Sequence, residues 1–288
     1  MSPPTTPKIP TGGVDTRPAA HYSAAVVGVL TNNHENPHLY PMRWRIHLSY
    51  LGTAYCGWQR QPNDPSVQQS IEEAFATILR QPVEITGCGR TDTGVHARYY
   101  VAHADVNDVA LNDKVVYHLN AILPHDIAIH SITEVAPTFH ARFDAIERQY
   151  RYYIHFNKDP FRTSTSWYLH QHAPLDQSKM HEAAALLLQY NHFKPFCKTG
   201  SDAGHFKCRL TESAWTFTED DTVYSIKANR FLRGMVRLIV GSCVNVGLGK
   251  ITIAELKESL DNQSLLPHAW SVPAEGLFLE RVGYGDSF

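Results

Sequence analysis

The sequence predicts an α+β fold with a mixed sheet and two similar halves. Segments that alternate apolar and polar residues with the period of a strand recur along the chain. Apolar stripes with the period of a helix lie between them, and the order of strands, helices and hairpins occurs twice. With 288 residues, 43% of them hydrophobic, the chain is long enough to bury a substantial core.

The first 42 residues differ in composition from everything that follows. They are rich in proline, glycine, threonine and serine without a sustained period, which is typical of a disordered extension. The apolar patch at 24–30 is too short and too poorly flanked for a signal peptide. Met42 directly precedes the first patterned segment, so either translation starts there or the extension is dispensable. We therefore expect an extension at 1–42 and two halves at 43–145 and 146–288.

The first half begins with a half-buried strand at 44–50, where apolar and polar residues alternate strictly. After a polar loop, Ser66 and Gln69 have the spacing of a capping box, and an apolar stripe follows to Leu79. The remaining expected elements are a strand at 83–86, a strand at 99–106, a helix at 114–123 capped by Asn112 or Asp113, and a strand at 127–135.

The second half repeats this pattern, starting with strict alternation at 148–156. Helical stripes are expected from Met180 to Leu188 and from Leu232 to Cys243, and Thr252 with Glu255 predicts the cap of a further helix. The remaining expected strands are at 214–218 and 223–229, joined by an acidic turn, and at 276–282.

Charge and cysteine content narrow the function classes. The formal net charge is −2, so a nucleic-acid partner would need a local basic stripe; 148–151 and 230–237 are locally dense in arginine, although ordinary solvated side chains explain them equally well. Five scattered cysteines without C-x-x-C indicate reduced thiols in a cytoplasmic protein. The spacing of His192, Cys197, His205 and Cys208 is not that of a zinc site, so we expect no metal. No apolar run is long enough to span a bilayer.

The run at 87–97, G-C-G-R-T-D-T-G-V-H-A, is the strongest candidate site. Three glycines around Arg90 and Asp92 indicate a tight loop that presents a carboxylate, which can act as nucleophile, base or ion-pair partner. A hairpin turn that happens to contain an aspartate is the simpler alternative. On an extended segment Arg90 shares a face with Asp92; it either biases the ionisation of Asp92 or stiffens the loop.

Two further residues are singled out by their surroundings. Tyr150 lies in R-Q-Y-R-Y, where aromatic and basic residues alternate as in segments that stack bases and bind phosphate; a core-facing tyrosine is the alternative. Arg237 interrupts an apolar helical face, so it either pairs with a carboxylate, for which Asp92 is the obvious candidate, or extends past the helix edge into solvent.

These motifs together resemble those of the tRNA pseudouridine synthase A family. The run at 87–97 is similar to its G-R-T-D-x-G-V-H-A signature, and Tyr150 and Arg237 fall in segments similar to R-x-Y-R-Y and F-x-x-x-M-V-R. The resemblance covers 44–284 and includes G-W-Q-R-Q at 57–61, F-H-A-R-F at 139–143 and P-A-E-G-L at 273–277. Cys88 and Thr93 replace commoner alanines, and Gly234 replaces a commoner bulky or basic residue.

The resemblance implies a fold and a reaction. The fold has two pseudo-symmetric halves that share a continuous, mostly antiparallel sheet with a basic cleft between them. The reaction is cofactor-free isomerisation of uridine to pseudouridine at positions 38, 39 and 40 of tRNA, by a homodimer in which tRNA spans both protomers. Asp92 corresponds to the nucleophile, Arg237 to its ion-pair partner, Arg90 to the residue that aids base flipping and Tyr150 to the residue that packs on the uracil.

Two other classes of protein compete with this interpretation. A non-catalytic RNA-binding protein on the same scaffold has no chemical reason to keep Asp92, Tyr150 and Arg237 together. A hydrolase with an aspartate nucleophile would need a metal or phosphate site, and the sequence has neither a phosphate loop nor a paired acidic motif.

Overall fold

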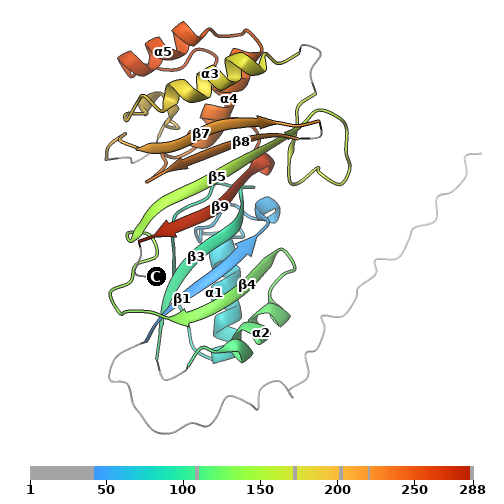
Figure 1. The fold of residues 1–288 in the computed structure, drawn as a ribbon. Helices are drawn as coiled ribbons and strands as arrows, with labels where there is room; N and C mark the ends of the chain where they lie inside the picture. The colour runs from blue at the N-terminus through green and yellow to red at the C-terminus, as the bar shows by residue number, and fades with distance from the viewer. Residues whose placement is uncertain (1–41, 108–109, 171–173, 201–203, 220, 286–288) are drawn as a thin grey trace, which may run out of the picture. The chain divides into compact units, whose positions relative to one another are not determined.

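The structure, a computed structural model, describes residues 42–107, 110–170, 174–200, 204–219 and 221–285 (Figure 1). The strands are β1 (Met42–Tyr50), β2 (Ile85–Gly87), β3 (His96–Val106), β4 (Ile127–Glu134), β5 (Ala145–His155), β6 (Trp167–Tyr168), β7 (Leu210–Phe217), β8 (Thr222–Ala228) and β9 (Leu277–Tyr284). The helices are α1 (Val67–Leu79), α2 (Asp113–Ile122), α3 (Gln177–Leu187), α4 (Met235–Gly247) and α5 (Ile253–Asn262), with single 3₁₀ turns η2 (Gly52–Ala54), η3 (Lys194–Phe196) and η4 (Ala274–Gly276).

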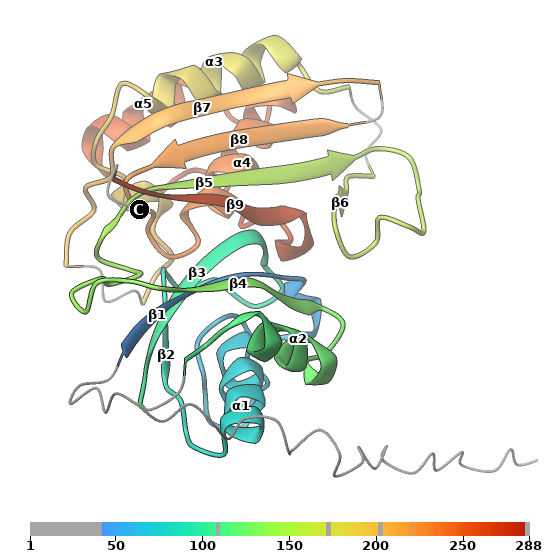
Figure 2. The ribbon, with the colours of Figure 1, turned by 60° about the horizontal axis from the view of Figure 1, so that its bottom comes forward.

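One mixed sheet joins the described strands in the order β4-β1-β3-β9-β5-β8-β7, with β2 beside β3 and β6 beside β5. Its pairs are antiparallel except β3–β9 and β5–β6. The last strand of the chain, β9, therefore lies between β3 of the first half and β5 of the second (Figures 1 and 2). The predicted α+β fold with a mixed, mostly antiparallel sheet is confirmed.

Local sequence signals explain where most helices begin. The Ser66 side chain accepts the Gln69 amide at the start of α1, Asn112 caps α2, and Thr252 with Glu255 forms a complete capping box at α5. The capping box predicted at α1 is only half formed. The Gln69 amide group donates to Glu73 one turn later, so it does not return to the cap.

The second half differs from the prediction at several points. Strand β6 was not predicted, and β7 starts at Leu210 and not at Ala214. Helix α4 starts at Met235 and not at Leu232, because Gly234 adopts a left-handed conformation with φ of 70° and so cannot continue a helix backwards. Leu188 is 45% exposed and caps α3, so it does not belong to the apolar stripe of that helix.

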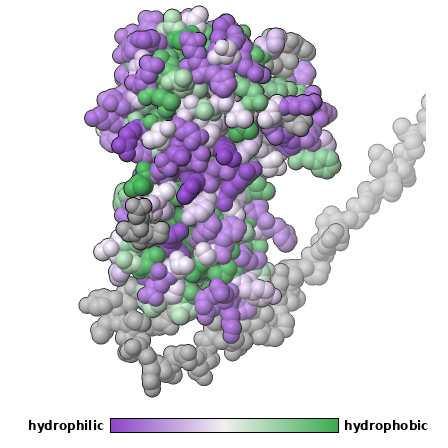
Figure 3. All heavy atoms as spheres, in the orientation of Figure 1, coloured by the Kyte–Doolittle hydropathy of each residue, from purple (hydrophilic) through white to green (hydrophobic). Residues whose placement is uncertain are grey.

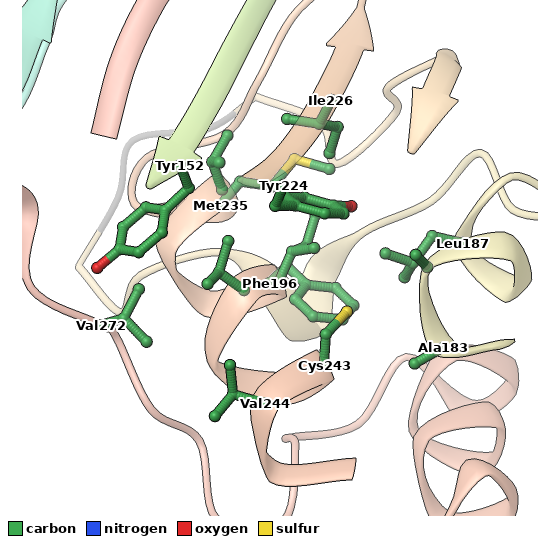
Figure 4. Close-up of a cluster of buried hydrophobic side chains, with 14 of the residues drawn as sticks. Tyr152, Ala183, Leu187, Phe196, Tyr224, Ile226, Met235, Cys243, Val244 and Val272 are labelled. Carbon is green, nitrogen blue, oxygen red and sulfur yellow. The ribbon is translucent and has the colours of Figure 1, made fainter. Parts of the chain in front are cut away.

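Two hydrophobic clusters fill the layers between sheet and helices. The first packs α1 and α2 on β1, β3 and β4, and the second packs α3, α4 and α5 on β5, β7 and β8. Figure 4 shows part of the second cluster, where Tyr224 of β8 lies between Ile226 of the same strand and Phe196 of η3. Hydrophilic side chains cover most of the face seen in Figure 3, with apolar ones in small groups between them.

The two clusters meet at the central strands. Leu279 and Val282 of β9 belong to the first cluster although β9 is the last strand of the chain. Tyr150 of β5 packs against both clusters. The boundary at 145/146 stays a prediction, and the extension predicted at 1–42 lies outside the described residues except for Met42, which begins β1. None of the helices in the described ranges is long and apolar enough to cross a membrane.

Helix α4 approaches residues 270–272 too closely for a side chain at Gly241. A Cβ there would lie 1.9 Å from the Trp270 carbonyl oxygen. Gly241→Ala should lower the free energy of unfolding by roughly 1–3 kcal/mol, the usual cost of overpacking, measured by urea denaturation. Gly204→Ala is the control, because a Cβ there meets nothing within 4 Å. Equal unfolding midpoints for the two variants would contradict this packing.

Candidate active site

A cavity of about 950 Å³ is lined by residues from both halves of the chain. Its wall contains the loop at 88–93, Tyr150 of β5, residues 229–234 and the first turn of α4. All four residues singled out by the sequence, Asp92, Arg90, Tyr150 and Arg237, line it. Segments that lie far apart in the sequence thus surround one space.

The loop at 88–93 rests on the segment that follows β1. The Trp58 amide donates to the Thr91 carbonyl at 3.3 Å, and the Tyr50 and Thr91 hydroxyls hydrogen-bond at 2.8 Å in the buried interior. Gly57 has φ of 91°, and a Cβ there would lie 2.3 Å from the Thr91 carbonyl oxygen. The G-W-Q motif therefore supports the loop, because only glycine permits this close approach.

A second set of contacts fixes the start of the loop. The Cys88 amide donates to the Val101 carbonyl at 2.8 Å, and the Tyr100 hydroxyl donates to the Gly89 carbonyl at 2.5 Å. The Tyr100 ring stacks on Trp58 with 4.0 Å between centroids. Because both Tyr100 and Trp58 are buried, the loop lies on a rigid aromatic base.

Asp92 occupies the first position of a tight turn. The Val95 amide donates to the Asp92 carbonyl at 3.1 Å, and Gly94 at the third position has φ of 77°, which type II turns require. The carboxylate is only partly buried, and no hydrogen bond to it is formed within the described part of the chain. A carboxylate held by its backbone but left without partners is available to a substrate.

Tyr150 lies beside this carboxylate with its hydroxyl free. Burial, with smaller contributions from Cys88 and Asp92, raises the pKa of Tyr150 well above its usual range. Its ring packs edge-on against Phe231 at 5.2 Å, and across residues 42–285 as described its hydroxyl has no hydrogen-bond partner. The phenol is therefore neutral and able to donate or accept a hydrogen bond in the cavity.

Arg237 reaches the cavity from the first turn of α4, where the helix dipole adds positive potential. Its Nε donates to the Val272 carbonyl at 2.5 Å, which anchors the side chain to the segment before β9. No ion pair joins Arg237 to Asp92 among the residues that the structure describes. The predicted pairing is thus not formed in this structure, although both groups face the same space.

The charges around the cavity are strongly unequal. Among the described residues that line it, six arginines accompany Asp92 as the one carboxylate: Arg90, Arg142, Arg148, Arg230, Arg233 and Arg237. Such a concentration of guanidinium groups favours anionic ligands, and guanidinium suits phosphate in particular. The formal net charge of −2 for the whole chain gives no sign of this basic site.

Comparison with known proteins identifies the family. The family model described as tRNA pseudouridine synthase matches residues 47–144 and 183–285. The chain belongs to the tRNA pseudouridine synthase family. The matched ranges contain the loop at 88–93 and Arg237, whereas Tyr150 lies between them.

Individual relatives agree with the family model. A tRNA pseudouridine synthase A of Porphyromonas gingivalis is 46% identical over 246 residues, covering 84% of this chain and 97% of that protein. The proteins of the same name from Bacteroides fragilis and a Picosynechococcus species are 43% and 38% identical, over 84% of this chain and 96% and 89% of theirs. A solved Cas6-RT-Cas1–Cas2 complex covers 69% of this chain and 42% of its own at 10% identity, but its TM-score of 0.22 carries no argument.

Arg148 is the residue of this synthase whose role sequence reasoning missed. Its guanidinium donates to four backbone carbonyls: Ala145 at 2.7 Å, Asn229 at 2.9 Å, Cys88 at 3.0 Å and Arg142 at 2.8 Å. It therefore ties the loop before Asp92 to β5 and to the segment after β8. The signal was the first arginine of R-x-Y-R-Y, two residues before Tyr150 on one face of the strand.

His96 performs a similar structural task below the loop. Its Nδ1 accepts the Gly52 amide at 2.9 Å, so its Nε2 carries the proton and donates to the Glu275 carbonyl at 3.1 Å. The ring is fully buried and connects the two halves. Burial lowers the pKa of His96, although the Glu275 carbonyl opposes this effect.

Arg148→Lys should weaken both stability and catalysis, because an ammonium cannot span four carbonyls as a planar guanidinium does. We expect the free energy of unfolding to fall by about 1–3 kcal/mol and kcat to fall with it. Urea denaturation and turnover assays measure the two effects. Arg281→Lys, an exposed change on β9, is the control and should match the wild type. Wild-type stability and kcat in Arg148→Lys would show that the four bonds are unimportant.

Stability should fall as the pH is lowered through the ordinary histidine pKa of about 6.5. Below that pH the unfolded chain binds a proton at His96 that the folded chain, with its lowered pKa, does not bind, so protonation favours unfolding. Urea denaturation at about pH 7 and pH 5 measures the loss. His96→Gln should make the loss smaller, whereas the exposed His125→Gln should leave it unchanged. An equal loss in wild type and His96→Gln would contradict this assignment.

Proposed function

We propose that the cavity around Asp92 is where this chain converts uridine in the anticodon stem-loop of tRNA to pseudouridine. One observation carries the proposal: Asp92, Tyr150 and Arg237, from three separate motifs, line a single cavity in which the other charged residues that the structure describes are arginines. Family membership supplies the reaction class, and the relatives' names supply the substrate.

Asp92 is the group that initiates the chemistry. The isomerisation breaks the N1–C1′ bond, turns the uracil and forms a C5–C1′ bond; the C5 proton is lost and N1 gains one, so no co-reactant is needed. In one route the Asp92 carboxylate adds to C1′, and in the other it removes a proton from the sugar to give a glycal. Both routes need an ionised, accessible carboxylate, and Asp92 has no protein partner to displace within the described chain.

The surrounding residues bind and orient the flipped nucleotide. Tyr150 packs on the uracil and offers its neutral hydroxyl for proton transfer. Arg237, held at Nε by Val272, lines the same cavity and stabilises the negative charge of Asp92 through its own positive charge. Arg90 is exposed beside the cavity and occupies the space that the flipped base leaves.

Two further parts of the proposal rest on the family resemblance. The first is a homodimer in which one tRNA contacts both protomers. The second is a cytoplasmic location, with which the five free cysteines agree. The arginines of the cavity supply contacts to the RNA backbone that tRNA binding needs.

The alternative is an RNA-binding protein that uses the same basic cavity without chemistry. The orphaned Asp92 carboxylate argues against it, because a lone negative charge amid arginines weakens the binding of phosphate. Chemistry explains the presence of this carboxylate, and simple RNA binding does not.

Asp92→Asn should abolish pseudouridine formation while leaving tRNA binding intact, because the amide keeps the shape but loses the charge and basicity. We expect kcat to fall by at least about a thousandfold with a dissociation constant within a few-fold of wild type. Pseudouridine is quantified in tRNA transcripts after incubation, and binding by filter retention. The exposed Asp113→Asn, at the start of α2, is the matched control. Near-wild-type turnover of Asp92→Asn would remove Asp92 from the mechanism.

A further inference from the structure

A large aromatic side chain is left open to solvent at the cavity wall. Phe143 is 75% exposed, although it lines the cavity together with Arg142. Leu232 and Met235 on the same wall are buried. An exposed phenylalanine is not unusual by itself, but one inside a basic cavity has a chemical use.

The turn that carries Phe143 is tightly closed. The Nδ1 of His140 accepts the amides of both Arg142 and Phe143 at 3.2 Å, and the Asp144 carboxylate accepts the His140 amide at 2.8 Å. The Arg142 carbonyl is held by Arg148 at 2.8 Å. The same arginine thus fixes the loop of Asp92 and the turn of Phe143 relative to each other.

The Phe143 ring is oriented as well as exposed. It packs against the His140 ring with 4.2 Å between centroids, and the Arg142 guanidinium lies 5.6 Å from its centre. No carboxylate pairs with Arg142 in the described part of the chain, so its charge is available to an anion. An open aromatic ring beside an available guanidinium suits a nucleotide, whose base stacks while its phosphate is neutralised.

We propose that Phe143 and Arg142 form a second nucleotide subsite, in which Phe143 stacks on a base next to the target uridine. This inference rests on the proposed function. The partly buried Tyr150 faces the flipped target, and Phe143 is too exposed to enclose a second flipped base, so it takes a base that stays outside. The stack holds the RNA strand after the target has left it, which offsets part of the cost of flipping.

The test uses full-length tRNA transcripts with 2-aminopurine at the nucleotides that flank the target uridine. Stacking on Phe143 changes the 2-aminopurine fluorescence when wild type binds. Phe143→Ala and Phe143→Leu should lose this change at one flanking position and raise KM by about tenfold, the effect of losing one stacked base, while kcat falls less. Phe143→Tyr keeps the ring and should behave as wild type.

A matched control separates the effect of lost stacking at Phe143 from the effect of removing any exposed aromatic ring. Phe161 is 93% exposed and does not line the cavity, so Phe161→Ala should change neither fluorescence nor KM. Wild-type fluorescence and KM in Phe143→Ala would overturn the subsite, as would full retention in Phe143→Leu, which keeps bulk without a ring. If wild type formed no pseudouridine, the proposed function would be overturned. The 2-aminopurine fluorescence change on tRNA binding would still report whether a base stacks on Phe143.

Discussion

The insertion of the last strand between the two halves is the constraint on which the site depends. Strand β9 pairs with β3 in parallel over only two register positions, His96–Phe278 and Ala97–Leu279, and with β5 in antiparallel over most of its length. So short a parallel pairing is weak by itself. The buried ring of His96 strengthens it by bonding the Glu275 carbonyl, and Tyr152 bonds Pro273 at 2.7 Å. Side chains that hold backbone carbonyls thus add to the backbone pairing where the two halves meet.

The same principle positions the groups around the cavity. The hydrogen bonds of the Arg148 guanidinium go to carbonyl oxygens, so Arg148 joins three segments while, among the described residues, no carboxylate bonded to it offsets its positive charge. Arg237 is anchored in the same way by Val272. A guanidinium neutralised by a carboxylate would fix the backbone equally well but would contribute little positive potential. Anchoring to carbonyls lets these arginines organise the loops and still attract an anionic substrate.

The aromatic residues divide into supports and contacts. Tyr50, Trp58 and Tyr100 are buried beneath the loop of Asp92. The hydroxyls of Tyr50 and Tyr100 hydrogen-bond to polar atoms of this loop. Tyr150 is partly buried, and its hydroxyl has no partner among the described residues, whereas Phe143 is largely exposed on a tightly closed turn. The buried rings thus hold the loop of Asp92, and the more exposed rings are those that we propose contact bases. Rigid rings lose little conformational entropy when a base stacks on them, which suits the proposed binding of a flipped nucleotide.

The sequence by itself determined the fold class, the order of the helices and of the strands other than β6, and four residues that line the cavity. Alternation at 44–50 and 148–156 identified β1 and β5, and the caps at Ser66, Asn112 and Thr252 placed three helices, because strand period and capping are local properties of the chain. The motifs at Asp92, Tyr150 and Arg237 were visible for the same reason.

Only the tertiary structure decided what those residues meet. Three findings depend on contacts between segments far apart in sequence. Arg148 binds four carbonyls, Arg237 bonds Val272 and forms no ion pair with Asp92 in the described chain, and the Phe143 side chain stays exposed. No local pattern specifies which carbonyl a long, flexible side chain will reach.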